Sequence, residues 1–213
     1  MTVARLMPTV VACAALLTGF VALVDAMTDG FDRWTFEDMR RAKAIRGELA
    51  ATPLEVRGPD GARSVLWRRT ADAREVVVVG FIYTRCRTVC LALGSEFTRM
   101  QQAIAETPGA PVRLVSLSID MDHETAGSLA SYARLHGART GSWTVAMPAA
   151  PEDAAKVLGE LGVVAIPDGL GGFVHNGAIH VMTARGRVLG IYDDADWREA
   201  LASATSYIAS GSP

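Results

Sequence analysis

Residues 75–90 read EVVVVGFIYTRCRTVC, an apolar, β-branched run that leads directly into two cysteines four positions apart. The run over residues 75–83 is apolar on both faces, which is typical of a central strand that is fully buried. We expect a helix to follow over about residues 88–105. Cys86 and Cys90 then lie at a strand-to-helix junction, on one helix face and one turn apart.

Cysteines at a helix start have a particular chemistry. Unpaired backbone N–H groups and the helix dipole favour the thiolate there, and Arg85 and Arg87 flank Cys86 with positive charge. Such a pair either forms a disulfide or offers two soft thiolates to a metal; the alternative is two buried, inert cysteines. Cys13, the third cysteine, lies in an apolar run. One close pair cannot hold together a domain of this size, so a disulfide-stapled fold is excluded.

Strands alternate with helices along most of the remaining chain. We expect strands over residues 112–119 and 142–147, helices over 123–136, 152–161 and 196–208, and a hairpin of residues 173–183 with 188–192. This order predicts an α/β domain with a thioredoxin-like fold. An extra helix over residues 35–50, capped by Thr35 and Asp38, and a hairpin around the Gly-Pro-Asp-Gly turn at 58–61 precede it.

The N-terminus has the features of a membrane segment. Residues 6–24, LMPTVVACAALLTGFVALV, are uncharged, and as a helix they rise about 28 Å, close to the ~30 Å hydrocarbon core of a bilayer. Arg5 precedes the run, and Asp25, Asp29 and Asp32 follow it. The positive flank predicts a cytoplasmic N-terminus and an exported domain.

Two alternatives to an uncleaved anchor remain open. Residues 24–26, Val-Asp-Ala, form a passable signal-peptidase site. Residues 10–13 resemble, more weakly, a lipoprotein signal in which Cys13 would carry the lipid. The apolar run is longer than a usual signal core and continues well past Cys13. All three alternatives export the domain.

Three segments together resemble one protein family. Residues 81–90, FIYTRCRTVC, resemble the Tyr-Thr-x-Cys-Pro-x-x-Cys-Pro signature of the Sco/SenC family of copper-binding proteins for cytochrome c oxidase assembly. Residues 115–125, VSLSIDMDHET, resemble its strand ending in Asp-Pro-x-x-Asp-Thr. Residues 173–190, FVHNGAIHVMTARGRVLG, resemble its Asp-His-Ser segment and the two strands that follow. The resemblance covers roughly residues 52–209.

The sequence also departs from the family pattern. Arg87 and Leu91 replace the two prolines beside the cysteines, and Met121 replaces the proline after Asp120. The residues on either side of His175 differ as well. The candidate ligands are therefore retained while their surroundings change.

The resemblance implies a copper site with Cys86, Cys90 and His175 as ligands. Two thiolates stabilise Cu(I) and an imidazole tolerates Cu(II), although zinc also accepts such a set. Asp120 is expected either to orient a ligand or act as an electrostatic partner of the metal without binding it, or to cap the helix that follows. His180 is expected to fill the core.

The other polar residues near these segments have simpler expected roles. His123 and His136 are expected to be solvated or to cap helix ends. Glu124 is expected to be an acid in the first turn of a helix.

These observations predict a copper metallochaperone for cytochrome c oxidase or another exported cuproprotein. The alternative is a thiol–disulfide oxidoreductase that reduces the cysteines of a copper-accepting partner; sensor and peroxidase roles are weaker. We predict an anchor over residues 1–26, a linker helix over 27–51 and the copper-binding domain over 52–213. The expected location is the inner (cytoplasmic) membrane, with the domain in the periplasm. A net charge of −2 argues against nucleic acid as a partner.

Overall fold

The computed structural model describes residues 3–72, 74–86, 89–107, 109–169 and 171–211. It divides the chain into two compact units, Met1–Ala42 and Lys43–Pro213. The predicted boundaries at residues 26 and 51 remain predictions.

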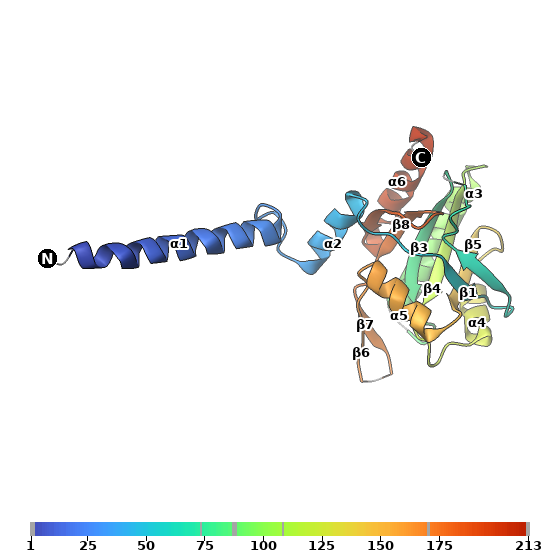
Figure 1. Cartoon of the computed structure of the whole chain (residues 1–213). Helices are drawn as coiled ribbons and strands as arrows, with labels where there is room; N and C mark the ends of the chain where they lie inside the picture. Colours follow the sequence, from blue (N-terminus) through green and yellow to red (C-terminus); the bar gives the residue numbers. More distant parts are fainter. Residues whose placement is uncertain (1–2, 73, 87–88, 108, 170, 212–213) are drawn as a thin grey trace. The chain divides into compact units, whose positions relative to one another are not determined.

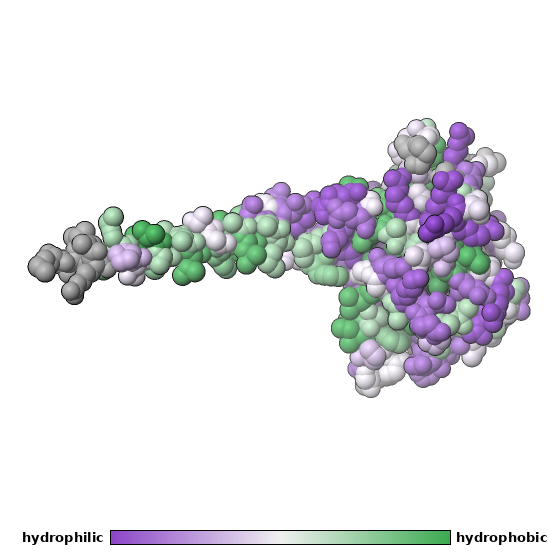
Figure 2. Space-filling model, viewed as in Figure 1, coloured by the Kyte–Doolittle hydropathy of each residue, from purple (hydrophilic) through white to green (hydrophobic). Residues whose placement is uncertain are grey.

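The first unit is dominated by one long apolar helix, α1 (Val3–Thr28). Within it, Leu6–Thr28 is long and apolar enough to cross a membrane, and its large apolar side chains are exposed (Figure 2). The shorter α2 (Phe36–Ile45) begins in this unit. The Asp38 N–H donates to Thr35 Oγ1 at 3.0 Å, which confirms the predicted cap.

The second unit is built on a mixed β-sheet (Figure 1). Among the described residues its strand order is β2-β1-β5-β4-β3-β8-β9. Strands β3, β4 and β5 run parallel, and the other pairs are antiparallel. The bounds are β1 Leu54–Arg57, β2 Arg63–Leu66, β3 Val76–Ile82, β4 Val112–Ser118, β5 Trp143–Pro148, β8 Ile179–Thr183 and β9 Val188–Tyr192. Every residue of β3 is buried, as its composition predicted.

Helices cover both faces of this sheet. They are α3 (Val89–Ala105), α4 (Ala126–His136), α5 (Pro151–Glu160) and α6 (Trp197–Ser210), with a 3₁₀ turn, η1 (Asp194–Asp196), before α6. Gly80 lies against α3, because a Cβ there would be 2.9 Å from Phe97. The next residue, Phe81, faces Val157 of α5. Residues of one strand alternate between faces, so covering both faces requires the continuous apolar run of β3.

The predicted strand over residues 173–183 is wrong as a single element. It is interrupted at residues 176–178, and its first part, β7 (Phe173–His175), pairs with an unpredicted strand, β6 (Ala165–Pro167), in a separate two-stranded sheet. The side chain of Asn176 explains the break: its Oδ1 accepts from the Val164 N–H at 2.6 Å, and its Nδ2 donates to the Gly162 carbonyl at 3.2 Å. These bonds end the β6–β7 hairpin where a longer strand was expected.

Helix α4 begins three residues later than predicted. Thr125 is its N-cap and forms a reciprocal capping box with Ser128. The segment between β4 and α4 is therefore a loop, and this loop contains Asp120 and Glu124. The architecture confirms the predicted thioredoxin-like α/β fold. It brings the loops after the parallel strands β3 and β4 to the same edge of the sheet.

Candidate functional site

The two cysteines lie at the predicted strand-to-helix junction. A turn follows β3, closed by the Cys86 N–H donating to the Tyr83 carbonyl at 3.1 Å. Helix α3 begins at Val89, and the Cys90 N–H donates to Cys86 Sγ at 3.4 Å. Neither cysteine forms a disulfide among the described residues, and both are buried, with Cys86 9% and Cys90 1% exposed. One turn of backbone therefore holds the two side chains together.

Burial changes the acidity of this pair from what the sequence indicated. The Cys90 pKa is raised to about 12, chiefly because the surrounding protein removes the thiol from water. The expectation that the helix start favours the thiolate is therefore wrong for Cys90 without a metal. The predicted contribution of Arg87 concerns a residue outside the described part of the chain and stays a prediction.

Tyr83 contacts both the cysteine turn and the β6–β7 hairpin. Burial and a hydrogen bond to the Cys86 side chain raise the pKa of Tyr83. Its ring packs edge-on against Phe173, with centroids 5.4 Å apart, and against His175 at 6.3 Å. Sequence reasoning assigned Tyr83 no role beyond its place in the motif. In the structure it is the side chain that connects His175 to the cysteine turn.

His175 is half-buried at the end of β7. Its Nδ1 accepts a hydrogen bond from the Gly177 N–H at 2.9 Å, and burial lowers its pKa. The ring is therefore favoured in its neutral form, with the proton on Nε2. A metal ligand needs a free nitrogen lone pair. Binding through Nδ1 uses the lone pair that accepts from Gly177, and binding through Nε2 moves the proton to Nδ1, so either route loses the Gly177 bond.

The described residues do not contain a preassembled metal cluster. No group of three His, Cys, Asp or Glu side chains among them is close enough to hold an ion. The structure brings Cys86 and Cys90 together and places His175 beyond Tyr83. The ligand role of His175 stays a prediction.

Asp120 lies at the end of β4, where its carboxylate is paired with two basic side chains. Arg85 Nη2 donates to its Oδ2 at 2.8 Å, and His123 Nδ1 lies 2.9 Å from its Oδ1. Burial alone raises the pKa of Asp120, but the hydrogen bonds from His123 and Arg85 outweigh burial and hold it below its usual value. The alternative role as a helix cap is wrong, because Thr125 caps α4.

Arg85 connects three parts of the site. It belongs to the cysteine turn, it pairs with Asp120, and its guanidinium lies beside the β6–β7 turn, where a Cβ at Gly171 would be 3.6 Å from Nη1. Its charge is therefore shared with Asp120 rather than directed at Cys86 alone. The predicted action of Asp120 on a metal ligand stays a prediction, and its carboxylate is hydrogen-bonded to Arg85 and His123.

Sequence reasoning gave Glu124 the wrong role. It lies in the loop before α4, is 8% exposed, and accepts hydrogen bonds from Thr84, Ser118 and Ser128. The available signal was the position of Thr84 and Ser118, two hydroxyl residues at the ends of neighbouring buried strands.

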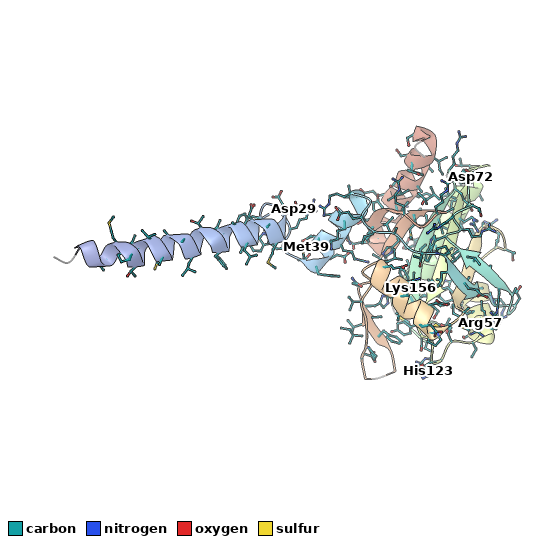
Figure 3. All side chains as sticks on the ribbon, viewed as in Figure 1. Asp29, Met39, Arg57, Asp72, His123 and Lys156 are labelled. Carbon is teal, nitrogen blue, oxygen red and sulfur yellow. The ribbon has the colours of Figure 1, made fainter. Side chains whose placement is uncertain are left out.

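The remaining histidines divide between core and surface. His180 is fully buried against Phe81, which confirms its predicted core role. His136 was predicted to be solvated or to cap a helix, which is wrong: it is buried 4.5 Å from the Tyr132 ring. His123 is exposed at the surface (Figure 3).

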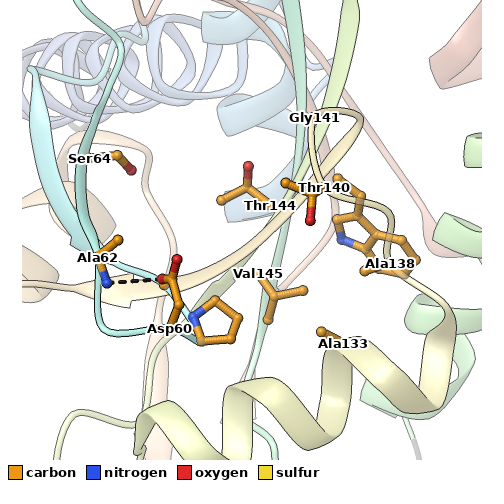
Figure 4. Close-up of a pocket in the computed structure, with 12 residues that line it drawn as sticks. Asp60, Ala62, Ser64, Ala133, Ala138, Thr140, Gly141, Thr144 and Val145 are labelled. Carbon is orange, nitrogen blue, oxygen red and sulfur yellow. Dashed lines mark hydrogen bonds between the residues drawn. The ribbon is translucent and has the colours of Figure 1, made fainter.

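A separate pocket of about 390 Å³ lies between the β1–β2 turn and the start of β5 (Figure 4). Trp143, at the start of β5, lines it, whereas the cysteine turn follows the opposite end of the parallel strands. The residues found to line it include neither cysteine nor histidine. It is not the candidate metal centre.

Fold and site define a thioredoxin-like protein with a dithiol at the first strand-to-helix junction of its parallel sheet. A family model described as SCO1/SenC matches residues 69–210. The chain therefore belongs to the SCO1/SenC family. A search of curated protein sequences gives no significant match.

Solved structures of Sco proteins share the fold at low sequence identity. BsSco, a member of the Sco family of cytochrome c oxidase assembly proteins, is 18% identical with a TM-score of 0.61, over 76% of this chain and 94% of BsSco. Copper-bound ScoI of Arabidopsis thaliana is 15% identical with a TM-score of 0.61, over 76% and 99% of the two chains. Copper-bound ScoI of Bradyrhizobium japonicum is 19% identical with a TM-score of 0.58, over 74% and 99%.

Proposed function

We propose that this chain binds copper through Cys86, Cys90 and His175 and supports the metallation of cytochrome c oxidase or another exported cuproprotein. The observation that carries the proposal is the dithiol at the start of α3 in a chain of the SCO1/SenC family. Copper-bound relatives and the oxidase assembly role stated for BsSco support it.

The chemistry of the donor set fits copper. Two sulfur donors and one imidazole are the ligand types that copper accepts in both oxidation states. Copper is the cargo in this proposal, and the protein contributes the ligands and their enclosure. Because thiolates are the ligands, Cys90 loses its proton on binding. His175 becomes the third ligand once its contact with Tyr83 and its hydrogen bond from Gly177 are broken.

The test is copper analysis of the reduced, full-length chain in detergent. We expect one copper per chain in the wild type and loss of stoichiometric binding in Cys86→Ser. His175→Ala should weaken binding by more than about 10–100-fold, the loss typical of a residue that only supports a ligand. Val174→Ala is the matched control, because Val174 is an exposed neighbour on the same strand and offers no metal ligand.

Two results would oppose the proposal. Sub-stoichiometric copper that Cys86→Ser leaves unchanged would exclude the dithiol as the binding site. An equal effect of His175→Ala and Val174→Ala would exclude His175 as a ligand while leaving the cysteine pair in place.

A thiol–disulfide oxidoreductase is the second candidate, and the proximity of the two sulfurs favours it. In this reaction the two thiols reduce a partner's disulfide; the chain gains an intrachain disulfide and the partner gains two thiols, with two electrons and two protons transferred. The reported disulfide switch in BsSco adds support. Because this reaction does not need His175, reduction of a partner disulfide that His175→Ala leaves intact would favour it over copper delivery.

We further propose that α1 anchors the protein in the inner (cytoplasmic) membrane, with the second unit in the periplasm. The support is the apolar length of Leu6–Thr28, with Arg5 before it and acidic residues after it. Labelling of a cysteine introduced at Asp60 by a membrane-impermeant reagent in spheroplasts tests the orientation. Protection of that cysteine until the membrane is broken would contradict it.

A further inference from the structure

Glu124 holds the cysteine turn through two hydrogen bonds to one residue. The Thr84 N–H donates to Glu124 Oε2 at 3.2 Å, and the Thr84 hydroxyl donates to Oε1 at 2.5 Å. Thr84 is the second residue of the turn that ends at Cys86. The carboxylate therefore fixes both the backbone and the side chain of this turn.

The same carboxylate is anchored to the domain by two further hydroxyls. Ser118, at the end of β4, donates to Oε2 at 2.5 Å, and Ser128, in the first turn of α4, donates to Oε1 at 2.5 Å. These partners belong to regular elements, and Ser118 is fully buried. Glu124 thus joins the cysteine turn to β4 and to α4.

These donors are uncharged, so they stabilise the buried carboxylate only while they are held in hydrogen-bonding geometry. Hydrogen bonds to an ionised acceptor are about twice as strong as those between neutral groups. A buried acceptor that loses its donors pays a desolvation penalty, so the arrangement resists movement of Thr84. The path from Thr84 to the Cys86 sulfur is two residues long. The position of that sulfur relative to Cys90 is therefore linked to the Glu124 carboxylate.

We propose that Glu124 is a positioning residue for the cysteine pair, which fixes the 83–86 turn so that the Cys86 sulfur stays within reach of Cys90. This inference rests on the proposed function of the pair. It assigns Glu124 no contact with the metal or with a partner protein. Its effect is to keep the two sulfurs prearranged, and ligand sites of this kind need their groups held to within about 0.5 Å.

The test measures the equilibrium of the dithiol with glutathione, using the full-length chain in detergent. Two protein thiols and one oxidised glutathione give one intrachain disulfide and two reduced glutathione molecules. We expect Glu124→Gln to shift this equilibrium about 10-fold toward the dithiol, because a looser turn lowers the effective concentration of one sulfur near the other. Glutamine keeps the size of the side chain but only one acceptor oxygen. Cu(I) affinity should also fall about 10–100-fold.

Two further variants separate positioning from general stability. Ser128→Ala removes a bond to Glu124 but leaves both bonds from Thr84, so it should lower the melting temperature with little change in the glutathione equilibrium. Thr84→Val removes the hydroxyl bond from the turn itself, so it should shift the equilibrium in the same direction as Glu124→Gln. In the Thr84→Val background, Glu124→Gln should have a smaller effect than in the wild type.

The proposal is overturned if Glu124→Gln and Ser128→Ala shift the equilibrium equally, or if the effect of Glu124→Gln is undiminished in the Thr84→Val background. If Glu124→Gln does not fold, Thr84→Val decides: an unchanged equilibrium overturns the proposal. The glutathione measurement does not require copper. A wild type without copper binding would therefore end the proposed function and leave the role of Glu124 to be decided by the thiol equilibrium.

Discussion

Asp194 is a carboxylate that the fold places where its charge is unfavourable. It begins η1, after β9, and its Oδ1 is shielded from solvent with no hydrogen-bond partner among the described residues. Burial, followed by the negative charges of Asp193 and Glu96, raises its pKa from 3.8 to about 6. We predict that Asp194→Asn, which removes the charge and keeps the shape, stabilises the protein at neutral pH.

The expected gain in stability of Asp194→Asn follows from the raised pKa of Asp194. A rise of about two units corresponds to ~3 kcal/mol if the whole shift acts on folding. Asp194 is only half-buried, so solvent screening reduces the expected gain to about 1–2 kcal/mol. This is a substantial part of the stability of an ordinary domain, which is about 5–15 kcal/mol.

The pH dependence of this gain in stability follows from proton linkage. Because the folded-state pKa is above the unfolded value, folding takes up a proton between pH 3.8 and about 6. The stability associated with this group is fully present below pH 3.8 and is lost as the pH rises through about 6. The advantage of Asp194→Asn should therefore be largest above pH 7 and vanish near pH 4.

The measurement is urea unfolding of the full-length chain in detergent, followed by tryptophan fluorescence at pH 7.5 and pH 4. Asp196→Asn, at an exposed residue of the same 3₁₀ turn, is the control and should change the free energy of unfolding little at either pH. An Asp194→Asn variant no more stable than the wild type at pH 7.5 would refute the reasoning. So would a gain that is the same at both values of pH.

Three further variants test the fold and the hairpin. Gly186→Ala should lower the free energy of unfolding by about 2–4 kcal/mol, because a Cβ there would clash with the Ala51 carbonyl oxygen. Gly109→Ala, with a positive φ but open space around it, should lose less, and equal losses in thermal melts would contradict the clash. Arg85→Gln should lower it by about 1–3 kcal/mol by leaving the Asp120 carboxylate with one basic partner fewer, and an unchanged urea midpoint would contradict this. Asn176→Ala should speed amide exchange in the β6–β7 hairpin alone; unchanged exchange there would contradict its bridging role.

Much of the fold could be predicted because its strongest signals are local. The apolar run of β3, the β1–β2 turn and the Thr35 cap are each encoded within a few residues. The position of Cys86 and Cys90 followed from the end of that run. Predictions failed where contacts to another segment decided the structure, as when Asn176 bonds to Gly162 and Val164 and ends the β6–β7 hairpin.

The site was harder to predict than the fold, because burial is a property of the assembled domain. A helix start lowers the pKa of a thiol when solvent and N–H groups surround it, but Cys90 is packed beneath the turn, and desolvation prevails. Glu124 shows the same limit: its sequence neighbours indicate a helix start, and only the fold brings Thr84 to it. His136 likewise becomes buried because α4 packs against α3, where a Cβ at Gly94 would meet the His136 ring.

The β6–β7 hairpin contacts the residue that begins the cysteine turn. Cys90 is 1% exposed, so a metal ion or a partner thiol reaches its sulfur only after the structure around it moves. The turn is held to β4 through Glu124, and Tyr83, its first residue, packs against Phe173 of the hairpin. The hairpin strands have three residues each, and Ile166 and Val174 on one of its faces are exposed. Figure 2 shows apolar surface over this hairpin.

The β6–β7 hairpin makes few packing contacts, and an element of this kind has low local stability. Its movement would separate His175 from Tyr83, which is the rearrangement that the proposed ligand role of His175 requires.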